Sequence, residues 1–192
     1  MKRMSHHENL KILAFVGLSG SGKTTAVDYF TEKGFPKVYF GGIIYQAMEE
    51  AGIAKGEENE HVFRVEIRKK EGVDFAAKRI IKQIHDLAAA GQHRVIADGL
   101  YTWDEYKILK HEFPSEITVV AIVTPKHQRY NRLEHREDRP QSQATTIERD
   151  KHEIEDIQKG GPIAAADYYI LNDGSKEDLD AKLEEVQTLV GF

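Results

Sequence analysis

The sequence contains no cysteine, so it can form neither a disulfide framework nor a metal site built from thiolates. It also lacks an apolar run of membrane-spanning length, and the polar residues 1–9 lack the apolar segment of a secretory signal. These absences predict a cytoplasmic protein without a membrane partner. The formal net charge of −5 argues against a broad nucleic-acid-binding surface, which leaves small phosphorylated molecules as the expected partners.

The composition is that of one globular domain. Hydrophobic residues make up 40% of the 192 positions and charged residues 31%, and this length is sufficient for a sizeable core. We expect residues 1–9 to form a flexible tail and residues 10–192 to form the domain. The adjacent His6 and His7 are more typical of a solvated tail than of a metal site.

One glycine-rich segment carries the most specific pattern in the chain. Residues 17–24 read Gly-Leu-Ser-Gly-Ser-Gly-Lys-Thr, in which two glycines separated by four residues precede Lys and Thr. The apolar run 11–16 before it is typical of a buried parallel strand, and apolar residues at helical spacing follow from Lys23 onward. A complete phosphate-loop motif between a strand and a helix predicts a nucleoside triphosphate site rather than a simple turn.

The chemistry of this loop assigns roles to its residues. Glycines let the backbone N–H groups turn toward a phosphate, and the following helix adds the positive end of its dipole. We expect Lys23 to be catalytic and to bind the β- and γ-phosphates, and Thr24 to coordinate Mg²⁺. The predicted nucleotide-binding residues of the loop are Gly17, Ser19, Gly20, Ser21, Gly22, Lys23, Thr24 and Thr25.

Strands and helices are expected to alternate along the rest of the chain. Apolar runs predict strands at 37–40, 94–97, 117–123 and 168–171, and capped or amphipathic segments between them predict helices. This alternation predicts an α/β fold in which helices cover both faces of a parallel sheet. The expected helices span 43–51, 73–90, 103–111 and 145–157, with another from Thr124-Pro125 and a last one after Ser175.

Three segments are expected to interrupt regular structure. Gly41-Gly42 follows the second strand and can turn the chain or admit a ligand closely. The charged segment 55–61 is predicted to be a mobile loop, and Gly160-Gly161-Pro162 is predicted to break the helix before it.

The run 64–71 is typical of a solvated helix face, with Arg68 as a candidate for phosphate binding.

Ligands of parallel α/β sheets bind beyond the carboxyl ends of the strands. This rule gathers the phosphate loop, Gly41-Gly42, Asp98 and the segment that follows the fourth strand along one edge. Asp98 ends the strand 94–97, and we expect it to hold Mg²⁺ or its water, or to accept a proton from an attacking hydroxyl. The alternative for Asp98 is an ordinary Asp-Gly turn.

Arginines dominate the segment after the fourth strand. Arg129, Arg132 and Arg136 are spaced i, i+3 and i+7, and Arg139 follows. Guanidinium groups are suited to clamp the charge that develops on a transferring phosphoryl group. We therefore predict catalytic roles for Arg132 and Arg136; the alternative is a helix face that forms ion pairs with neighbouring carboxylates.

These features together resemble the dephospho-CoA kinase and nucleoside monophosphate kinase group. The residues that carry the resemblance are the phosphate loop, Asp98-Gly99, the arginines of 129–139 and the closing segment 166–175. Within the group, the chain is most similar to dephospho-CoA-kinase-like P-loop proteins that are often labelled only as ATPases. The resemblance extends from Lys11 to the final helix.

The resemblance implies a three-layer P-loop NTPase fold with a five-stranded parallel sheet in the order 2-3-1-4-5. It implies an acceptor-binding insert at 41–72, a small helical lid at 126–147 and an adenine pocket near Asn172 and Gly174. ATP and Mg²⁺ are then the expected cofactors. The residues expected to bind the acceptor are Gly42, Arg68, Tyr101 and Arg139.

Two positions depart from the pattern of that group. Its members tend to carry an aspartate just after the second strand, whereas residues 40–43 here are Phe-Gly-Gly-Ile. An arginine often found after the Asp-Gly pair is Tyr101 here, whose hydroxyl can still hydrogen-bond a substrate. Dephospho-CoA is the leading acceptor, and a nucleoside monophosphate is the second. A nucleotide-dependent switch or slow ATPase without a small acceptor stays open, as does the choice between monomer and homodimer.

Overall fold

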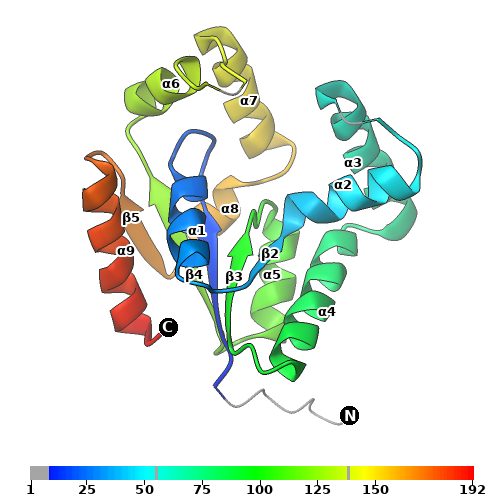
Figure 1. The fold of residues 1–192 in the computed structure, drawn as a ribbon. Helices are drawn as coiled ribbons and strands as arrows, with labels where there is room; N and C mark the ends of the chain where they lie inside the picture. Colours follow the sequence, from blue (N-terminus) through cyan, green and yellow to red (C-terminus); the bar gives the residue numbers. More distant parts are fainter. Residues whose placement is uncertain (1–8, 55, 138) are drawn as a thin grey trace.

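A computed structural model describes residues 9–54, 56–137 and 139–192 (Figure 1). Residues 1–8 of the predicted tail therefore lie outside the described residues. The strands form one parallel sheet in the order β2-β3-β1-β4-β5, which confirms the predicted α/β fold and its strand order. The strands are β1 (Lys11–Val16), β2 (Lys37–Tyr39), β3 (Arg94–Asp98), β4 (Ile117–Val123) and β5 (Tyr168–Leu171).

The central strands are buried because their side chains are apolar on both faces. In β1, Ile12 and Ala14 belong to the core on one side of the sheet, and Leu13 and Phe15 belong to the core on the other. Each of these four residues is at most 1% exposed. Both faces of the sheet must therefore be covered by other elements, as is usual for parallel sheets.

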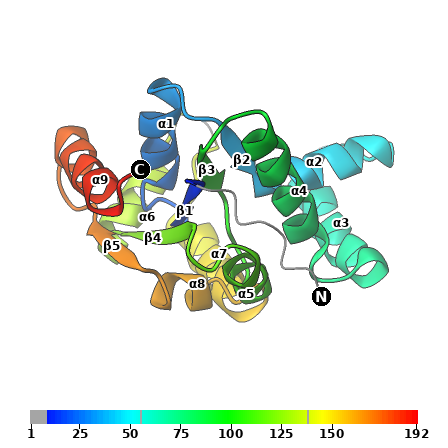
Figure 2. The same cartoon turned by 90° about the horizontal axis from the view of Figure 1, so that it is seen from below.

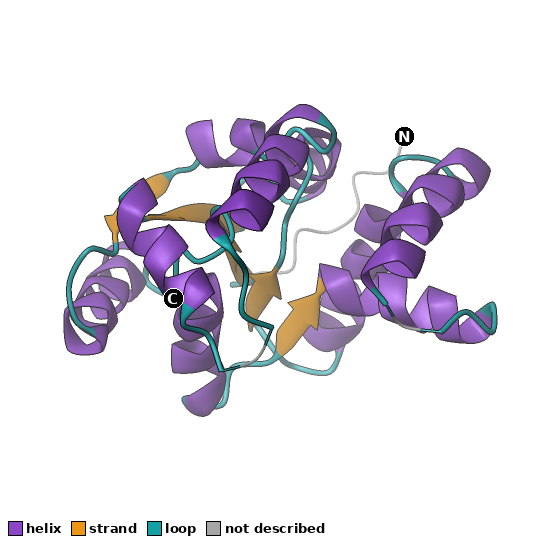
Figure 3. Ribbon diagram, turned by 90° about the horizontal axis from the view of Figure 1, so that it is seen from above, coloured by secondary structure: helices purple, strands orange, loops and turns teal. Residues whose placement is uncertain are grey.

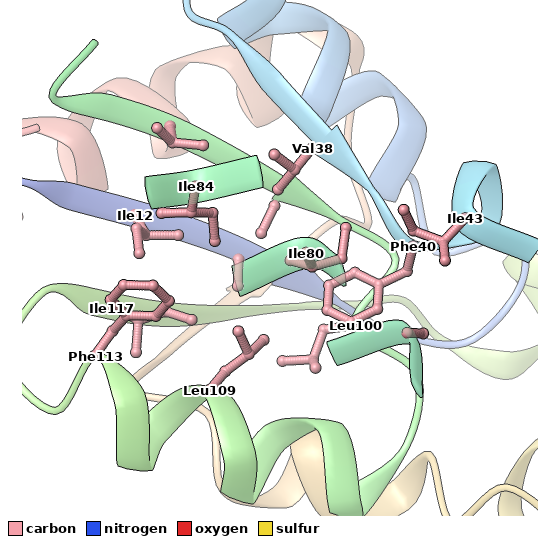
Figure 4. Close-up of a cluster of buried hydrophobic side chains, with 14 of the residues drawn as sticks. Ile12, Val38, Phe40, Ile43, Ile80, Ile84, Leu100, Leu109, Phe113 and Ile117 are labelled. Atoms are coloured by element: carbon pink, nitrogen blue, oxygen red, sulfur yellow. The ribbon is translucent and has the colours of Figure 1, made fainter. Parts of the chain in front are cut away.

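Helices provide this cover on both sides (Figures 1 and 2). α1 (Lys23–Glu32) and α9 (Lys176–Val190) pack on one face, and α4 (Phe75–Ala89), α5 (Trp103–Glu112) and α8 (Gly160–Ala164) pack on the other. Figure 4 shows the core on the α4–α5 side, where side chains of both helices meet those of the strands. Full burial of one large aliphatic side chain contributes about 1.5–3 kcal/mol to the free energy of unfolding. The many buried side chains of the two cores therefore fix the positions of the strands.

Two helical segments lie beyond the carboxyl ends of the strands (Figures 1 and 3). α2 (Phe40–Glu50) and α3 (Glu57–Glu71) follow β2, and α6 (Lys126–Glu134) and α7 (Gln143–Glu155) follow β4. They occupy the places predicted for an acceptor-binding insert and a lid, and both roles stay predictions. No helix in the described ranges is long and apolar enough to cross a lipid bilayer.

The predicted turn at Gly41-Gly42 is wrong, because both glycines belong to the first turn of α2. Phe40, Ile43 and Ile44 of this helix are buried at helical spacing, and their packing outweighs the low helix propensity of the glycines. The ring of Tyr39 folds back against the two glycines, where added Cβ atoms would crowd it. The missing side chains therefore make room for Tyr39 at the start of the helix.

One further local prediction is wrong. The predicted loop 55–61 is helical from Glu57 onward, because α3 begins there; residue 55 lies outside the described residues. Phe63 and Ile67, one turn apart in α3, are both buried and fix the helix against its neighbours. The predicted break of the preceding helix is confirmed, because α7 ends at Glu155, and Gly160-Gly161-Pro162 then open the separate helix α8. Pro162 lies in the first turn, where a backbone N–H would have no helical partner.

Candidate functional site

The phosphate loop leaves β1 at its carboxyl end and leads into α1, as the motif predicts. Gly22 immediately precedes α1 with a φ of 98°, in the left-handed region that favours glycine. The side chain of Asn172 lies so close that a Cβ atom on Gly22 would collide with it. The Nζ atom of Lys23 donates a hydrogen bond to the backbone oxygen of Leu18 at 3.1 Å. Thr24 is exposed in the first turn of α1.

The remaining predicted loop residues are packed against other elements. Gly17 lies against the backbone of β4, and Gly20 lies against α6, so a side chain at either position would collide with these elements. Thr25 is partly buried. Ser21 is 1% exposed, and its Oγ atom has no hydrogen-bond partner within the described part of the chain.

Residues that follow β4 and β5 form hydrogen bonds with the backbone of the phosphate loop. The Nδ2 atom of Asn172 donates a hydrogen bond to the backbone oxygen of Ser21 at 2.8 Å. The Oγ1 atom of Thr124 lies 3.0 Å from the same oxygen and 2.9 Å from the backbone oxygen of Asn172. Asn172 was predicted to bind nucleotide; its buried side chain positions the backbone of the phosphate loop.

Arg129 connects the loop to both helices of the segment that follows β4. Its guanidinium group donates to both carboxylate oxygens of Asp150 on α7. Its Nη1 atom also donates to the backbone oxygen of Ser19 at 2.7 Å. Arg129 is 5% exposed, so this bidentate pair is a buried link between α6, α7 and the phosphate loop.

Arg132 lies near the predicted adenine pocket. Its Nη2 atom donates to the backbone oxygen of Asn172 at 3.2 Å, and its Nη1 atom lies 3.4 Å from the Oγ1 atom of Thr124. The Nε2 atom of Gln128 donates to the backbone oxygen of Asp173 at 3.3 Å, and its Oε1 atom is buried without a partner among the described residues. A pocket of about 310 Å³ lies here, lined by His127, Gln128, Asn131, Arg132, Asp173 and Gly174.

Arg136 and Arg139 are not aligned with Arg132 on one helix. α6 ends at Glu134, so the expected i, i+4 relation between Arg132 and Arg136 is absent. Arg136 is exposed, and Arg139 is exposed with a φ of 54°, which is uncommon for a residue other than glycine. The roles predicted for these two arginines stay predictions.

Asp98 ends β3 beside β1, at the edge of the sheet where the phosphate loop begins. Burial raises the pKa of its carboxyl, and the nearby ammonium groups of Lys37 and Lys23 oppose this shift. The Nζ atom of Lys37 lies 4.0 Å from Oδ2 of Asp98. A carboxyl group with a raised pKa at this edge is suited to accept a proton.

Thr24 and Asp98 offer the oxygen ligands that Mg²⁺ prefers, and both lie near the phosphate loop. Elsewhere in the described ranges, no three His, Cys, Asp or Glu side chains gather into a possible metal site. Mg²⁺ usually takes one or two protein ligands and completes its shell with waters and substrate phosphates. These two residues therefore fit a magnesium ion that arrives with a nucleotide.

Sequence reasoning missed a buried charged cluster beside the loop. Glu153 of α7 accepts hydrogen bonds from Lys159 Nζ at 2.8 Å and from Ser19 Oγ at 2.9 Å. Burial raises the pKa of the Glu153 carboxyl, but the ammonium group of Lys159 outweighs this effect, and the pKa falls to about 2. Burial, followed by repulsion from Lys159, lowers the pKa of Lys23 to about 7.

The predicted acceptor side is only partly described. The backbone N–H of Tyr101 donates to the carboxylate of Glu105, and the ring of Tyr101 lies 4.9 Å from the Nζ atom of Lys159. Gly42 lies inside α2, and the side chain of Arg68 lies outside what the structure describes. A second pocket, of about 330 Å³, is lined by Trp103, Ile154, Gln158, Gly160 and Gly161.

A phosphate loop at the carboxyl edge of a parallel sheet in this strand order defines a P-loop NTPase fold. The AAA domain family model matches residues 13–158. The UPF0200 protein TK1334 of Thermococcus kodakarensis is 34% identical over 178 residues, which cover 91% of this chain and 95% of the relative. The chain therefore belongs to the AAA domain family and to the UPF0200 proteins.

Solved structures share the fold at low sequence identity. Shikimate kinase from Bacteroides thetaiotaomicron is 13% identical, with a TM-score of 0.58 and coverage of 95% of this chain and 99% of that one. Dephospho-CoA kinase from Campylobacter jejuni is 16% identical, with a TM-score of 0.53 and coverage of 95% and 98%. At these identities the likeness concerns the fold alone.

Proposed function

We propose that the protein is an ATP-dependent phosphotransferase that moves the γ-phosphoryl group to a hydroxyl or phosphate of a small, nucleotide-like acceptor. The observation that carries this proposal is the position of Lys23 and the phosphate loop beside Asp98, at one edge of the sheet. Dephospho-CoA is the leading acceptor, because the residues of this chain resemble dephospho-CoA kinases and a structure of that name shares the fold.

The proposed step is an in-line transfer. The acceptor oxygen attacks the γ-phosphorus, the bond from that phosphorus to the β–γ bridging oxygen breaks, and ADP leaves. Asp98 takes the proton of the acceptor hydroxyl, and Lys23 stabilises the negative charge on the β- and γ-phosphates. Thr24, and Asp98 through one of the ion's waters, would hold Mg²⁺, which would neutralise part of the phosphate charge.

A second candidate is a slow ATPase or nucleotide switch without a small acceptor. The observation that favours it is the start of α2, where residues 40–43 offer no carboxylate to the acceptor side. Hydrolysis would then use water in place of the acceptor, with the same phosphate loop. The two candidates differ in whether an added acceptor increases ADP formation.

The test measures ADP formation by the full chain with ATP and Mg²⁺. Dephospho-CoA, a set of nucleoside monophosphates and buffer alone are compared, and mass spectrometry identifies any phosphorylated product. Phosphorylated acceptor in equal amount to ADP supports the phosphotransferase. ADP formed at one rate in every sample supports the ATPase.

Lys23→Ala should abolish turnover while the fold persists, since it removes the charge that holds the terminal phosphates. Wild-type turnover by folded Lys23→Ala would overturn both candidates.

A further inference from the structure

The carboxylate of Glu153 bridges the phosphate loop and a buried lysine. Its Oε1 atom accepts a hydrogen bond from Ser19 Oγ at 2.9 Å, and its Oε2 atom accepts one from Lys159 Nζ at 2.8 Å. The side chains of Glu153 and Lys159 are 8% and 2% exposed. One oxygen of Glu153 thus contacts a loop whose motif predicts phosphate binding, and the other contacts the buried Lys159.

Three cationic side chains act on this carboxylate. Arg149 Nε donates to Glu153 Oε1 at 3.3 Å, and the ammonium groups of Lys159 and Lys23 both act on the same carboxylate. Asp98 acts on Lys23 less strongly than Glu153 does. Among these cations the Lys159 ammonium group is buried, and a ligand with several negative charges offsets the cost of burying it.

Lys159 also stands between the two halves of the proposed reaction. On one side, Glu153 connects its ammonium group to Ser19 of the phosphate loop. On the other side, the ammonium group lies 4.9 Å from the centre of the Tyr101 ring, next to the predicted acceptor side. In the proposed reaction, the phosphoryl group would pass between these two sides, and so past Lys159.

We propose that Lys159 is a second phosphate-binding lysine and that Glu153 occupies the position of the terminal phosphate when no nucleotide is bound. This proposal rests on the proposed nucleotide site. A nucleoside triphosphate displaces the Glu153 carboxylate from Ser19, and the Lys159 ammonium group then contacts the γ-phosphate oxygens. Lys159 is a catalytic residue in this scheme, because it stabilises the transferring group together with Lys23. A nucleoside diphosphate lacks the γ-phosphate, so it does not compete with Glu153.

The experiment compares dissociation constants for a nonhydrolysable ATP analogue and for ADP, measured by calorimetry on the full chain. Lys159→Met should weaken binding of the analogue by roughly 10- to 100-fold, the range for one charge-assisted hydrogen bond, and should leave ADP binding unchanged. Glu153→Gln should strengthen binding of the analogue, because the internal competitor loses its charge. Lys151→Met, at an exposed lysine of α7, is the matched control and should bind like wild type.

Lys159→Met leaves the Glu153 carboxylate buried without its lysine, which can unfold the protein. The double variant Glu153→Gln/Lys159→Met avoids this, and it should bind the analogue at least tenfold more weakly than Glu153→Gln alone. Equal affinities of these two variants would overturn the proposal. If the two affinities are equal but Lys23→Ala no longer binds the analogue, only the role of Lys159 is wrong and the proposed function stands. Failure of the wild type to bind the analogue would instead contradict the proposed function itself.

Discussion

The Oγ atom of Ser19 donates a hydrogen bond to the Oε1 atom of Glu153 at 2.9 Å, although 134 positions separate the two residues in the sequence. The backbone oxygen of the same serine accepts a hydrogen bond from Arg129. Ser19 is therefore held by α6 through its backbone and by α7 through its side chain. A movement of Ser19 around a nucleotide would change its hydrogen bonds to Arg129 of α6 and Glu153 of α7. The phosphate loop is thus linked directly to both helices of the predicted lid.

We expect nucleotide binding at pH 8 to take up protons. The pKa of Lys23 is lowered to about 7, so this lysine is mostly neutral at pH 8 in the free protein. Phosphate oxygens favour the ammonium form, so binding should draw up to roughly one proton from the solvent. Calorimetry of an ATP analogue in two buffers with different ionisation enthalpies measures this uptake. Proton uptake should be smaller in Lys23→Gln. Equal uptake by this variant and wild type would show that Lys23 is not the group that takes up the proton.

Asp98→Asn should lower the rate of the chemical step by about a hundredfold or more, the usual scale for a positioned acid–base group. The variant keeps the size of the side chain but cannot accept the proton of the attacking hydroxyl. Nucleotide affinity without Mg²⁺ should barely change, and single-turnover kinetics separate this step from binding. If only the melting temperature fell and the rate stayed normal, Asp98 would be an ordinary turn residue.

The cluster around Glu153 should make stability depend on pH in the acid range. The pKa of Glu153 is about 2 in the folded protein, below its usual value of 4.5. A carboxyl with a depressed pKa stabilises the fold above its unfolded pKa, and this contribution is lost as the pH falls from 4.5 to about 2. Urea unfolding should therefore show a larger gap between wild type and Glu153→Gln at pH 6 than at pH 3.

The matched control is Glu148→Gln, at an exposed position of the same helix. Its free energy of unfolding should follow that of wild type at both values of pH, because exposed charges contribute little. A gap for Glu153→Gln that is the same at pH 6 and pH 3 would show that the carboxylate charge does not stabilise the fold.

The sequence was sufficient for the sheet and the phosphate loop because both signals are local. The apolar runs of the strands and the spacing of Gly17, Gly22 and Lys23 can be recognised without tertiary contacts. The start of α2 could not be recognised in this way. Two consecutive glycines favour a turn by propensity, and only the packing of neighbours such as Phe40 makes the segment helical.

The buried side of α7 shows why part of the site was missed. Thr146, Asp150 and Glu153 follow one another at i, i+4 and i+7, so they share one face of the helix. That face is polar, and hydrophobic periodicity does not reveal a buried polar stripe. Lys159 gives no local signal either, since its burial depends on a carboxylate of a different element. Such pairs become visible only once the helices are placed in space.

The last prediction separates a phosphotransferase from an ATPase and concerns Arg136. A phosphotransferase must exclude water from the transferring group, so its lid must close. Arg136 is exposed beyond the end of α6, and closure of the predicted lid would bring it toward the phosphates. Arg136→Ala should then lower transfer to the acceptor far more than affinity for an ATP analogue, whereas Arg94→Ala, at the amino end of β3, should change neither. If no acceptor increases ATP turnover and Arg136→Ala hydrolyses ATP as fast as wild type, Arg136 is a solvated residue and the switch becomes the better proposal.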